Sequence, residues 1–388
     1  MKKVIIILYS LWLPLLANGQ AYWERFETDA TDNMNACFWY IPTANAGPRQ
    51  KLVGYDLVVV NPETQYNNPD FLPFLRKNGV RKILVYNNYL EQPVHFDQIK
   101  PWSNRVLTEL RERYPQWFLK QADGRPVVFW DKTEMMNISI ECPRIGDRTY
   151  SEWMAERILR DLLLVGPYQD ENIPLPVIPD SLRYDGLLLD NLWSEISWLT
   201  EKNGGQTLDF NNDGVADSPE AMSRRFQDGS NYYLSLIRAR TGRDFLIIGN
   251  YGSADYLDRV NGKQFENFPD IYQGKKTREG AWVMSLLNAK LSPGPDIFNA
   301  KENEEWFVLL SSKLIDNVYF AYLQNMPFKP EYRSLNLGKA VSSLNEYQGI
   351  YFRAFENGAV YVNPTDTTGW ITYVGGYKRD NFFDYDEN

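Results

Sequence analysis

The segment Tyr184-Asp185-Gly186-Leu187-Leu188-Leu189-Asp190-Asn191 carries the strongest fold signal in the chain. Its short, continuous apolar run is typical of a strand that is buried on both faces in a parallel sheet. In a parallel barrel the active site lies at the carboxyl ends of the strands. We therefore expect Asp190 and Asn191 to face a cleft, whereas Asp185, which precedes the run, is expected at the opposite, structural end. The alternative for Asp190 is an aspartate in a loop or at a helix N-cap.

Strand-like and helix-like segments alternate on both sides of this run. The strand-like runs lie at residues 55–60, 81–86, 135–140, 187–190, 245–250, 260–268, 296–299 and 318–323. The helix-like segments lie at residues 69–77, 102–113, 151–164, 220–240, 281–289 and 302–315, with Ser151 as an expected N-cap and Gly242 as the glycine that closes its helix. About eight such units predict an α/β fold of the (β/α)8 TIM-barrel type. An open, doubly wound parallel sheet is the alternative.

The C-terminal region has a different pattern. Residues 349–355 and 359–363 flank Asn357-Gly358, a dipeptide that favours a type I′ turn between two antiparallel strands. Residues 370–373 could add a third strand. We therefore predict a small C-terminal antiparallel β element, a hairpin packed on the barrel. The expected organisation is a signal peptide at residues 1–19, the catalytic barrel at residues 20–330 and the C-terminal element at residues 331–388.

The N-terminus has the pattern of a secretory signal peptide. Lys2 and Lys3 precede an apolar run at residues 4–17, and small residues follow it, with Gly19 as the expected cleavage position. The run is shorter than the stretch of about 20 apolar residues that a membrane-spanning helix needs. No later apolar run is long enough either. We expect a secreted or periplasmic protein without a membrane span.

Composition narrows the chemistry. The net charge of −9 argues against nucleic-acid binding, which usually needs a basic patch. His95 is the only histidine, which nearly excludes a Ser-His-Asp triad or a multi-histidine zinc site, and His95 itself is expected in a surface loop. Cys37 and Cys142 form no CxxC motif, and whether they pair stays open. Acid–base chemistry is left to carboxylates, and the 12 Trp, 25 Tyr and 20 Phe suit a cleft in which sugar rings stack.

A second carboxylate ends another strand-like segment, at residues 260–268. Glu266 lies there among aromatic residues that include Phe265 and Phe268. An apolar setting disfavours the charged form of a carboxyl group and raises its pKa, which suits a general acid. We expect Glu266 to be buried and protonated near neutral pH, while Asp190, with its polar neighbours, is ionised. The alternative for Glu266 is a surface glutamate on a loop.

These two segments resemble the glycosyl-hydrolase-like family 15, as does the tail from Tyr351-Phe352-Arg353-Ala354-Phe355-Glu356-Asn357-Gly358 through Asn363-Pro364. More distantly, they are similar to glycoside hydrolase family 114, the endo-galactosaminidases. The resemblance covers most of the mature chain. It implies that Asp190, ending strand 4 of the barrel, is the nucleophile and that Glu266, ending strand 6, is the acid/base. The chain departs from the pattern in the gap between these two residues, which is longer than a plain strand–helix repeat needs.

The predicted function is that of a secreted glycoside hydrolase of the retaining type, which cleaves glycosidic bonds of a polysaccharide or oligosaccharide. The alternative is a non-catalytic glycan-binding barrel. We expect carbohydrate-binding residues around the catalytic pair, although a buried capping amide is an equal alternative for Asn250. The predicted set is Tyr86, Asn88, Asn191, Trp193, Asn250 and Tyr251.

Part of the gap is an acidic motif at residues 209–220, which fits D-x-[DN]-x-[DN]-G-x5-E at every defined position. Calcium needs several oxygen ligands on a tight turn, and Gly214 permits such a turn. The predicted ligands are Asp209, Asn211, Asp213, Val215, Asp217 and Glu220. We expect a structural Ca²⁺ there and no organic cofactor. A solvated, Asx-rich turn is the alternative.

Overall fold

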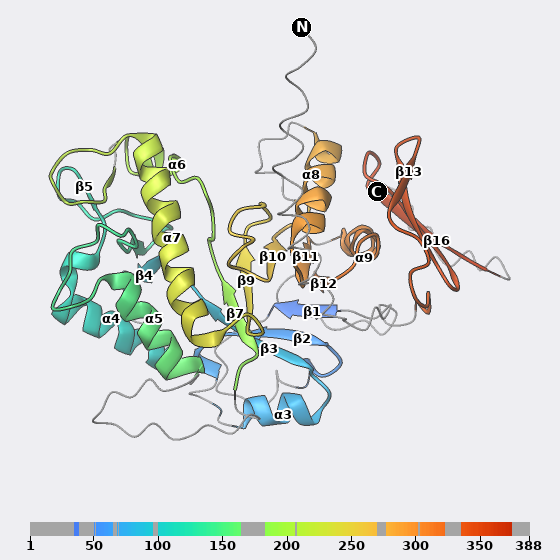
Figure 1. Ribbon diagram of the computed structural model, residues 1–388, viewed down its shortest axis with the longest axis horizontal. Coiled ribbons are helices and arrows are strands. Elements are labelled where there is room, and N and C mark those ends of the chain that lie inside the picture. The colour runs from blue at the N-terminus through green and yellow to red at the C-terminus, as the bar shows by residue number, and fades with distance from the viewer. Residues whose placement is uncertain are drawn as a thin grey trace, which may run out of the picture.

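The structure is a computed structural model, which describes residues 35–38, 50, 52–64, 68, 70–95, 100–163, 183–205, 208–269, 277–301, 303–322 and 335–374. Eight parallel strands form a closed barrel in the order β1-β12-β11-β10-β9-β7-β3-β2 (Figure 1). They are β1 (Asn35–Phe38), β2 (Leu57–Val60), β3 (Lys82–Asn87), β7 (Gly186–Leu189), β9 (Leu246–Asn250), β10 (Gly262–Phe265), β11 (Asp296–Ala300) and β12 (Val318–Tyr322). The ring closes through β1, which pairs with both β12 and β2. This confirms the predicted barrel and excludes the open, doubly wound sheet.

One predicted strand is wrong, and one barrel strand was not predicted. Residues 135–140 do not join the barrel; instead β6 (Thr133–Met135) pairs with β4 (Glu91–Pro93) in a small antiparallel sheet, within the long insertion between β3 and β7. Met136 and Ile138 are buried in the core of that insertion, so their apolar run reports burial and not membership of the main sheet. The missing strand is β1. The barrel lacks the predicted strand at residues 135–140 but includes β1, which precedes β2. In chain order β7 is therefore still the fourth barrel strand and β10 the sixth.

Inward and outward side chains alternate along the barrel strands, as the pleat of a strand requires. The inward residues form one apolar cluster, made of Leu57, Val59, Leu84, Tyr86, Leu188, Leu246, Ile248, Ile297, Tyr319 and Ala321. The amino end of the fourth strand is closed by Asp185, whose carboxylate accepts hydrogen bonds from Arg76 Nη2 at 3.1 Å and from the Ile83 N–H at 2.7 Å. Asp185 therefore has the structural role expected from the sequence.

Helices cover the outside of the barrel (Figure 1). They are α3 (Phe71–Lys77), α4 (Pro101–Arg113), α5 (Tyr150–Ile158), α6 (Trp198–Lys202), α7 (Pro219–Thr241), α8 (Arg278–Leu291) and α9 (Glu305–Lys313), and α5 continues as a π-helical turn, Leu159–Leu163. Gly242 ends α7 at a φ of 72° and donates its N–H to the Arg238 carbonyl oxygen. This confirms the predicted closing glycine, because a left-handed residue costs least when it has no Cβ.

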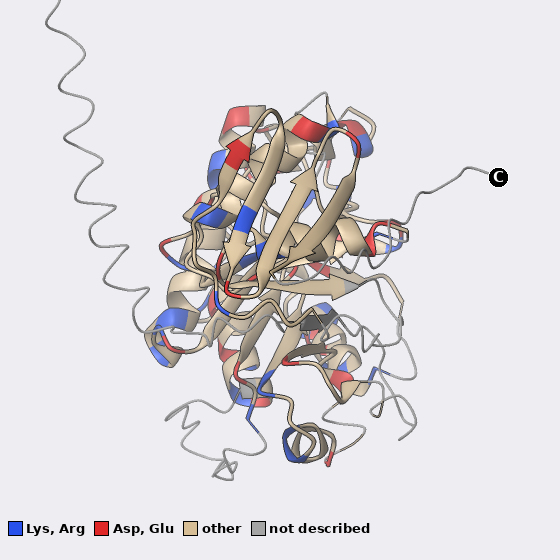
Figure 2. Ribbon diagram, turned by 90° about the vertical axis from the view of Figure 1, so that its right-hand side faces the viewer, with Lys and Arg blue, Asp and Glu red and all other residues tan. Residues whose placement is uncertain are grey.

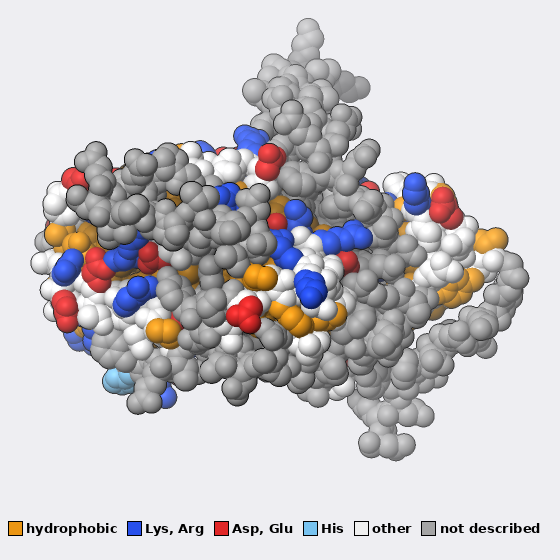
Figure 3. Space-filling model, turned by 90° about the horizontal axis from the view of Figure 1, so that it is seen from below, with side chains coloured by type: hydrophobic (Ala, Val, Ile, Leu, Met, Phe, Trp, Pro, Cys, Tyr) orange, Lys and Arg blue, Asp and Glu red, His pale blue; other side chains and the backbone are white. Residues whose placement is uncertain are grey.

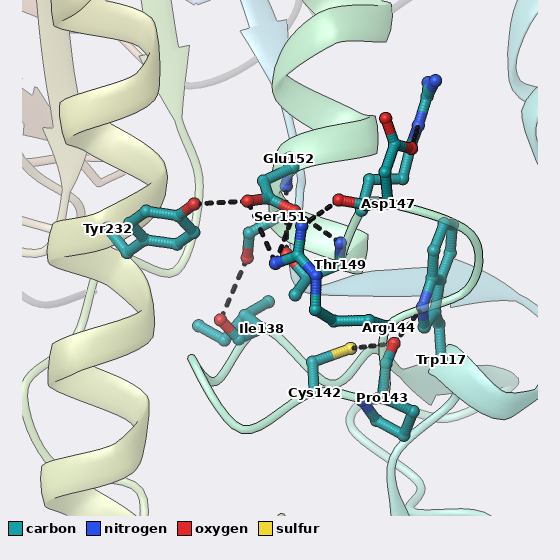
Figure 4. Close-up of polar contacts among 11 residues, drawn as sticks. Trp117, Ile138, Cys142, Pro143, Arg144, Asp147, Thr149, Ser151, Glu152 and Tyr232 are labelled. Atoms are coloured by element: carbon teal, nitrogen blue, oxygen red, sulfur yellow. Dashed lines mark hydrogen bonds and ion pairs between the residues drawn. The ribbon is translucent and has the colours of Figure 1, made fainter.

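The start of α5 corrects a predicted cap (Figure 4). The N-cap is Thr149: its Oγ1 accepts the Glu152 N–H at 3.4 Å, and the Glu152 carboxylate accepts the Thr149 N–H at 2.6 Å, which forms a capping box. Ser151, the predicted cap, is buried inside the helix and donates its hydroxyl to the Ile138 carbonyl oxygen. The Tyr232 hydroxyl donates to Glu152 at 2.6 Å and ties α7 to α5.

The structure describes only part of what the sequence predicts for the N-terminus and the two cysteines. The predicted signal peptide at residues 1–19 and the side chain of Cys37 lie outside them. Cys142 is a buried free thiol that contacts the Pro143 carbonyl oxygen at 3.8 Å (Figure 4). Across the described part of the chain, no helix has the length and apolarity that crossing a membrane requires.

The C-terminal element is a four-stranded antiparallel sheet in the order β13-β14-β15-β16. Its strands are β13 (Asn345–Tyr347), β14 (Ile350–Phe355), β15 (Gly358–Asn363) and β16 (Thr368–Tyr373), and Figure 2 shows this sheet from the front with few charged residues on it. One face packs on α9, where Phe355, Val360 and Val362 share a core with Leu310. A small antiparallel element packed on the barrel is therefore confirmed.

The hairpin turn lies one residue earlier than predicted. Phe355 pairs with Gly358, so the two turn residues are Glu356 and Asn357. Neither Asn357 nor Gly358 has a positive φ, so the turn is not the type I′ turn that the dipeptide favours. Gly358 serves a different purpose, since a Cβ at this position would lie 2.2 Å from the Thr372 carbonyl oxygen on β16.

Candidate active site

The carboxyl ends of β3, β7, β9 and β10 bring polar side chains to one rim of the barrel. The register of these parallel strands puts one polar residue of each at the same level. These four residues are Asn88, Asp190, Asn250 and Gln264. Glu266 follows β10 directly, two residues beyond Gln264, and therefore belongs to the same face one step higher.

A single amide joins the two predicted catalytic carboxylates. Asn250 Nδ2 donates to Asp190 Oδ1 at 2.7 Å and to Glu266 Oε2 at 2.9 Å. The separation of these two oxygens cannot exceed the sum of those distances. The structure thus brings Asp190 and Glu266 together at the ends of the fourth and sixth strands, and Asn250 is a bridge between them.

Asp190 is held by further donors. The Tyr86 hydroxyl, which points into the barrel from β3, donates to Asp190 Oδ2. The Asn191 N–H donates to Asp190 Oδ1 at 2.8 Å. With Asn250, three groups from three different strands or strand ends fix the orientation of this carboxylate.

Glu266 is exposed, which corrects the expectation that its aromatic neighbours bury it. Phe265 and Phe268 pack away from it, against Phe298, at centroid distances of 5.1 and 4.0 Å. Successive side chains on a strand point to opposite faces, and Asn267 then turns the chain with a φ of 56°. Aromatic residues adjacent in sequence therefore line the outer core and leave Glu266 at the open side of the rim.

Two more of the predicted binding residues lie in strained or buried positions at this rim. Asn191 is buried and has a φ of 56°. Tyr251 has a φ of 130°, which is unfavourable for a bulky residue, and its N–H donates to the Gln264 carbonyl oxygen at 3.1 Å. Backbone strain of this kind is concentrated at functional sites. The ring of Trp193 lies 6.2 Å from that of Tyr251, edge to face.

One tryptophan of the insertion between β3 and β7 forms an aromatic wall with two tryptophans that follow β7. Trp130 is 41% exposed; its ring meets Trp193 edge to face at 5.8 Å and stacks on Trp198 at 5.6 Å. We call Trp130, Trp193 and Trp198 the tryptophan wall. Trp130 and Trp198 were not predicted for the site. Only the tertiary placement of the insertion brings Trp130 to the residues that follow the fourth strand.

A third carboxyl group of the site, Glu91, was also missed. It accepts hydrogen bonds from Asn88 Nδ2 at 2.5 Å and from the Thr133 hydroxyl, which come from two different segments. Burial raises the pKa of Glu91, and the charge of Asp190 raises it further. Glu91 begins β4, in the insertion after β3, so it does not end a strand-like apolar run and the sequence gives no signal for it.

The acidic turn at residues 209–220 is held together mainly by bonds within itself. Asp209 accepts the N–H groups of Asp213 and Gly214, at 3.2 and 2.8 Å. Asp213 in turn accepts the Val215 N–H and Asn211 Nδ2, both at 2.8 Å. Asn211 Oδ1 differs from these groups because it is buried without a partner among the described residues.

The expected ring of oxygen ligands is not preformed in this turn. Asp217 pairs with Arg225, which also pairs with Glu141, and Glu220 is exposed in the first turn of α7. Within the described ranges, no three His, Cys, Asp or Glu side chains are grouped so that they could hold a metal ion. The donors fit calcium only in part, and calcium binding stays a prediction. His95 is exposed, as expected, and is pale blue in Figure 3.

Comparisons with known proteins find similar folds but no related sequence. No family model matches the chain, and no curated protein matches it. Similar solved structures include a noncanonic maltogenic alpha-amylase from Thermotoga neapolitana, with a TM-score of 0.47, 10% identity, and coverage of 86% of this chain and 86% of that chain. They also include a Flavobacterium johnsoniae GH31 dextranase complexed with glucose (TM-score 0.42, 8% identity, 78% of this chain and 37% of that chain).

A third is the type III pullulan hydrolase from Thermococcus kodakarensis (TM-score 0.41, 11% identity, 85% of this chain and 69% of that chain). These neighbours are glycoside hydrolases. Their low TM-scores and identities leave the family of this chain open, including its resemblance to glycosyl-hydrolase-like family 15.

Proposed function

We propose that this chain is a retaining glycoside hydrolase that acts on a polysaccharide or oligosaccharide, with Asp190 as nucleophile and Glu266 as acid/base. The observation that carries the proposal is the bridge made by Asn250, at 2.7 Å from one carboxylate and 2.9 Å from the other. The carboxyl groups of retaining pairs are about 5–5.5 Å apart, whereas those of inverting pairs are about 6.5–9.5 Å apart. The two bridged carboxylate oxygens lie at most about 5.6 Å apart, which is the sum of the two bridge distances. This limit is below the range of inverting pairs and therefore favours the retaining class.

The chemistry assigns each group one task. Asp190, oriented by Tyr86 and Asn250, attacks the anomeric carbon, and the bond from that carbon to the leaving oxygen breaks. Glu266 gives its proton to the leaving oxygen, so the leaving sugar departs as an alcohol. Glu266 then takes a proton from water, whose oxygen attacks the same carbon and releases Asp190. The exposed position of Glu266 suits a group that meets both the leaving sugar and the incoming water.

The tryptophan wall supports a sugar as the substrate. The apolar C–H face of a pyranose stacks on flat aromatic rings, while its hydroxyl groups need polar partners. Trp130 is exposed above residues that follow the fourth strand, and Trp193 lies between it and Tyr251. The rim thus combines aromatic faces with amides and carboxylates. The predicted signal peptide would place such an enzyme outside the cytoplasm, and a calcium ion at residues 209–220 would have a structural role.

The second candidate function is a glycan-binding barrel without turnover, which the tryptophan wall supports as well, because stacking on aromatic rings binds a sugar without hydrolysing it. A panel of polysaccharides and oligosaccharides, incubated with wild type and with Asp190→Asn, separates the two functions. The enzyme releases new reducing ends from at least one glycan, with the anomeric configuration of the first product retained by NMR, and Asp190→Asn releases none. Binding of glycans by both proteins without release of reducing ends would establish the binder instead.

A further inference from the structure

Two amide oxygens at the barrel mouth lack hydrogen-bond partners among the described residues. They are Gln264 Oε1 on β10 and Asn299 Oδ1 on β11. Gln264 is 1% exposed and Asn299 is 2% exposed. A buried carbonyl oxygen without a donor costs free energy, and native proteins contain few of them, so each such atom calls for a partner.

Both side chains face into the barrel. Gln264 pairs in register with Ile297, and Asn299 pairs with Ala321. Ile297 and Ala321 belong to the inward apolar cluster, and register partners in parallel strands share a face. The two amides therefore point into the same space as the catalytic pair and away from the helices.

Their positions flank Glu266. Gln264 lies two residues below Glu266 on the same face of β10, and it pairs in register with Asn250, the bridge to Asp190. Phe265, the last residue of β10, pairs with Phe298. Asn299 and Glu266 are each the next residue along the chain, so they follow this last pair on adjacent segments. One unpartnered oxygen is thus below the acid/base and the other is beside it, within the wall of the site.

We propose that Gln264 and Asn299 accept hydrogen bonds from two hydroxyl groups of the sugar unit whose anomeric carbon reacts, and that they select for sugars with hydroxyls at those positions. This deepens the proposed function and rests on it. A neutral amide oxygen can only accept, and a sugar hydroxyl can only satisfy it by donating. A site built to accept from a hydroxyl rejects the deoxy analogue strongly, because the buried oxygen is then left unpaired.

The test replaces each amide by an apolar side chain of similar size, in Gln264→Met and Asn299→Leu. Removing an unpartnered buried oxygen leaves the Tm of the free protein unchanged or higher. We expect kcat/KM on the best glycan of the panel to fall about 10- to 100-fold in each variant. Ser285→Ala is the matched control, since Ser285 Oγ on α8 is also buried and unpartnered among the described residues, and it should keep full activity.

A second measurement does not depend on turnover. D-Glucose, D-galactose and D-mannose are each added at high concentration to wild type, Gln264→Met, Asn299→Leu and Ser285→Ala, and the Tm is recorded. We expect at least one sugar to raise the Tm of wild type and of Ser285→Ala, and the shift to be lost in the two amide variants. The 2-deoxy, 3-deoxy and 4-deoxy forms of that sugar then show which hydroxyl each amide reads.

The outcomes separate this inference from the proposed function. Hydrolysis by wild type with undiminished kcat/KM in both amide variants would overturn the inference and leave the function standing. A sugar-induced Tm shift that the variants lose, in a protein that hydrolyses no glycan, would keep the binding role and overturn the enzyme. A fall of several degrees in the Tm of the free variants would show that the amides make structural contacts, against the inference.

Discussion

The barrel rim around Asp190 and the acidic turn at residues 209–220 are both rich in carboxylates and amides, but they use them differently. In the turn, Asp209 accepts two backbone N–H groups and Asp217 pairs with Arg225. At the rim, two buried amide oxygens, Gln264 Oε1 and Asn299 Oδ1, have no partner among the described residues. Polar groups that are satisfied within the chain stabilise the fold, whereas groups that are left over are available to a ligand.

The largest expected effect is at the rim. Asp190→Asn removes the nucleophile and should lower kcat by at least about 10³-fold, because no covalent intermediate can form. The Tm should stay within a few degrees of wild type, since the amide oxygen still accepts from the Asn191 N–H. The measurement is the release of reducing ends from the best glycan of the panel.

Two controls accompany this variant. Asp190→Ala leaves space for a small anion, and azide should restore part of the turnover of an activated aryl glycoside. Asp217→Asn changes a carboxylate of the turn in the same way and should keep full kcat. Comparable losses of kcat in Asp190→Asn and Asp217→Asn would remove the contrast between the two regions.

The next effect is on stability and lies in the turn. Asp217→Ala removes a mostly buried ion pair with Arg225 and the acceptor of the Phe210 N–H. The free energy of unfolding should fall by about 3 kcal/mol, because the half-buried Arg225 then keeps Glu141 as its one carboxylate partner among the described residues. Urea unfolding measures this loss. Asp213→Ala, at an exposed position of the same turn, should lower the free energy of unfolding much less. Equal losses in the two variants would show that Asp217 has no special role.

The fold was predictable where an apolar run is short and ends at polar residues, as at residues 187–190. Such a run reports burial on both faces, and in β2, β3, β7 and β9 burial coincides with membership of the barrel. At residues 135–140 it does not, because Met136 and Ile138 fill the core of an insertion. Sequence reports burial, whereas the partner that buries a segment is decided by tertiary packing.

The site was predictable to the same extent. Asp190, Asn250 and Glu266 each end a strand, so a barrel brings them to one rim. The burial of Glu266 was wrong, because neighbours in sequence point to the other face of the strand. Glu91 and Trp130 could not be found, since they belong to the insertion, and only its folding over the rim brings them to Asp190 and Trp193.

A smaller effect is expected on the outward face of the strands that carry Gln264 and Asn299, where Asp296 makes stability depend on pH. Gln264 and Asn299 face the mouth, whereas Asp296 of β11 faces outward, is 1% exposed, and accepts the Lys263 N–H at 2.6 Å and the Ser292 hydroxyl at 2.7 Å. Burial raises the pKa of Asp296 to about 8. A raised pKa in the folded state stabilises the fold below the unfolded value near pH 4, and this contribution is lost as the pH rises towards 8.

Asp296→Asn keeps the accepting oxygen and removes this titration. Between pH 5 and pH 7, wild type should lose up to about 1.4 kcal/mol per pH unit relative to the variant. This window avoids Lys263, whose pKa burial lowers to about 8, so that its contribution changes only above that pH. Urea unfolding at three pH values gives both slopes, and parallel slopes would show that Asp296 is ionised throughout.

The smallest expected effect is that of calcium on the stability of the acidic turn, where Asn211 has an unpartnered side-chain oxygen like those of the rim amides. Asn211 Oδ1 is buried without a partner among the described residues, and Asp213 lies beside it, so the turn offers calcium an incomplete set of oxygens. Asp217 is paired with Arg225 and is therefore not free to bind the ion. We expect calcium binding to be weak for this reason, with a dissociation constant in the millimolar range. At a calcium concentration equal to that constant the stabilisation is about 0.4 kcal/mol, a rise in Tm of about 0.5 °C for a chain of this length. Asn211→Ala should abolish the rise, and magnesium at the same concentration should not produce it. A rise in Tm that persists in Asn211→Ala would show that calcium binds elsewhere. The turn would then be a purely structural element, and the unpartnered oxygen of Asn211, unlike those of Gln264 and Asn299, would bind no ligand.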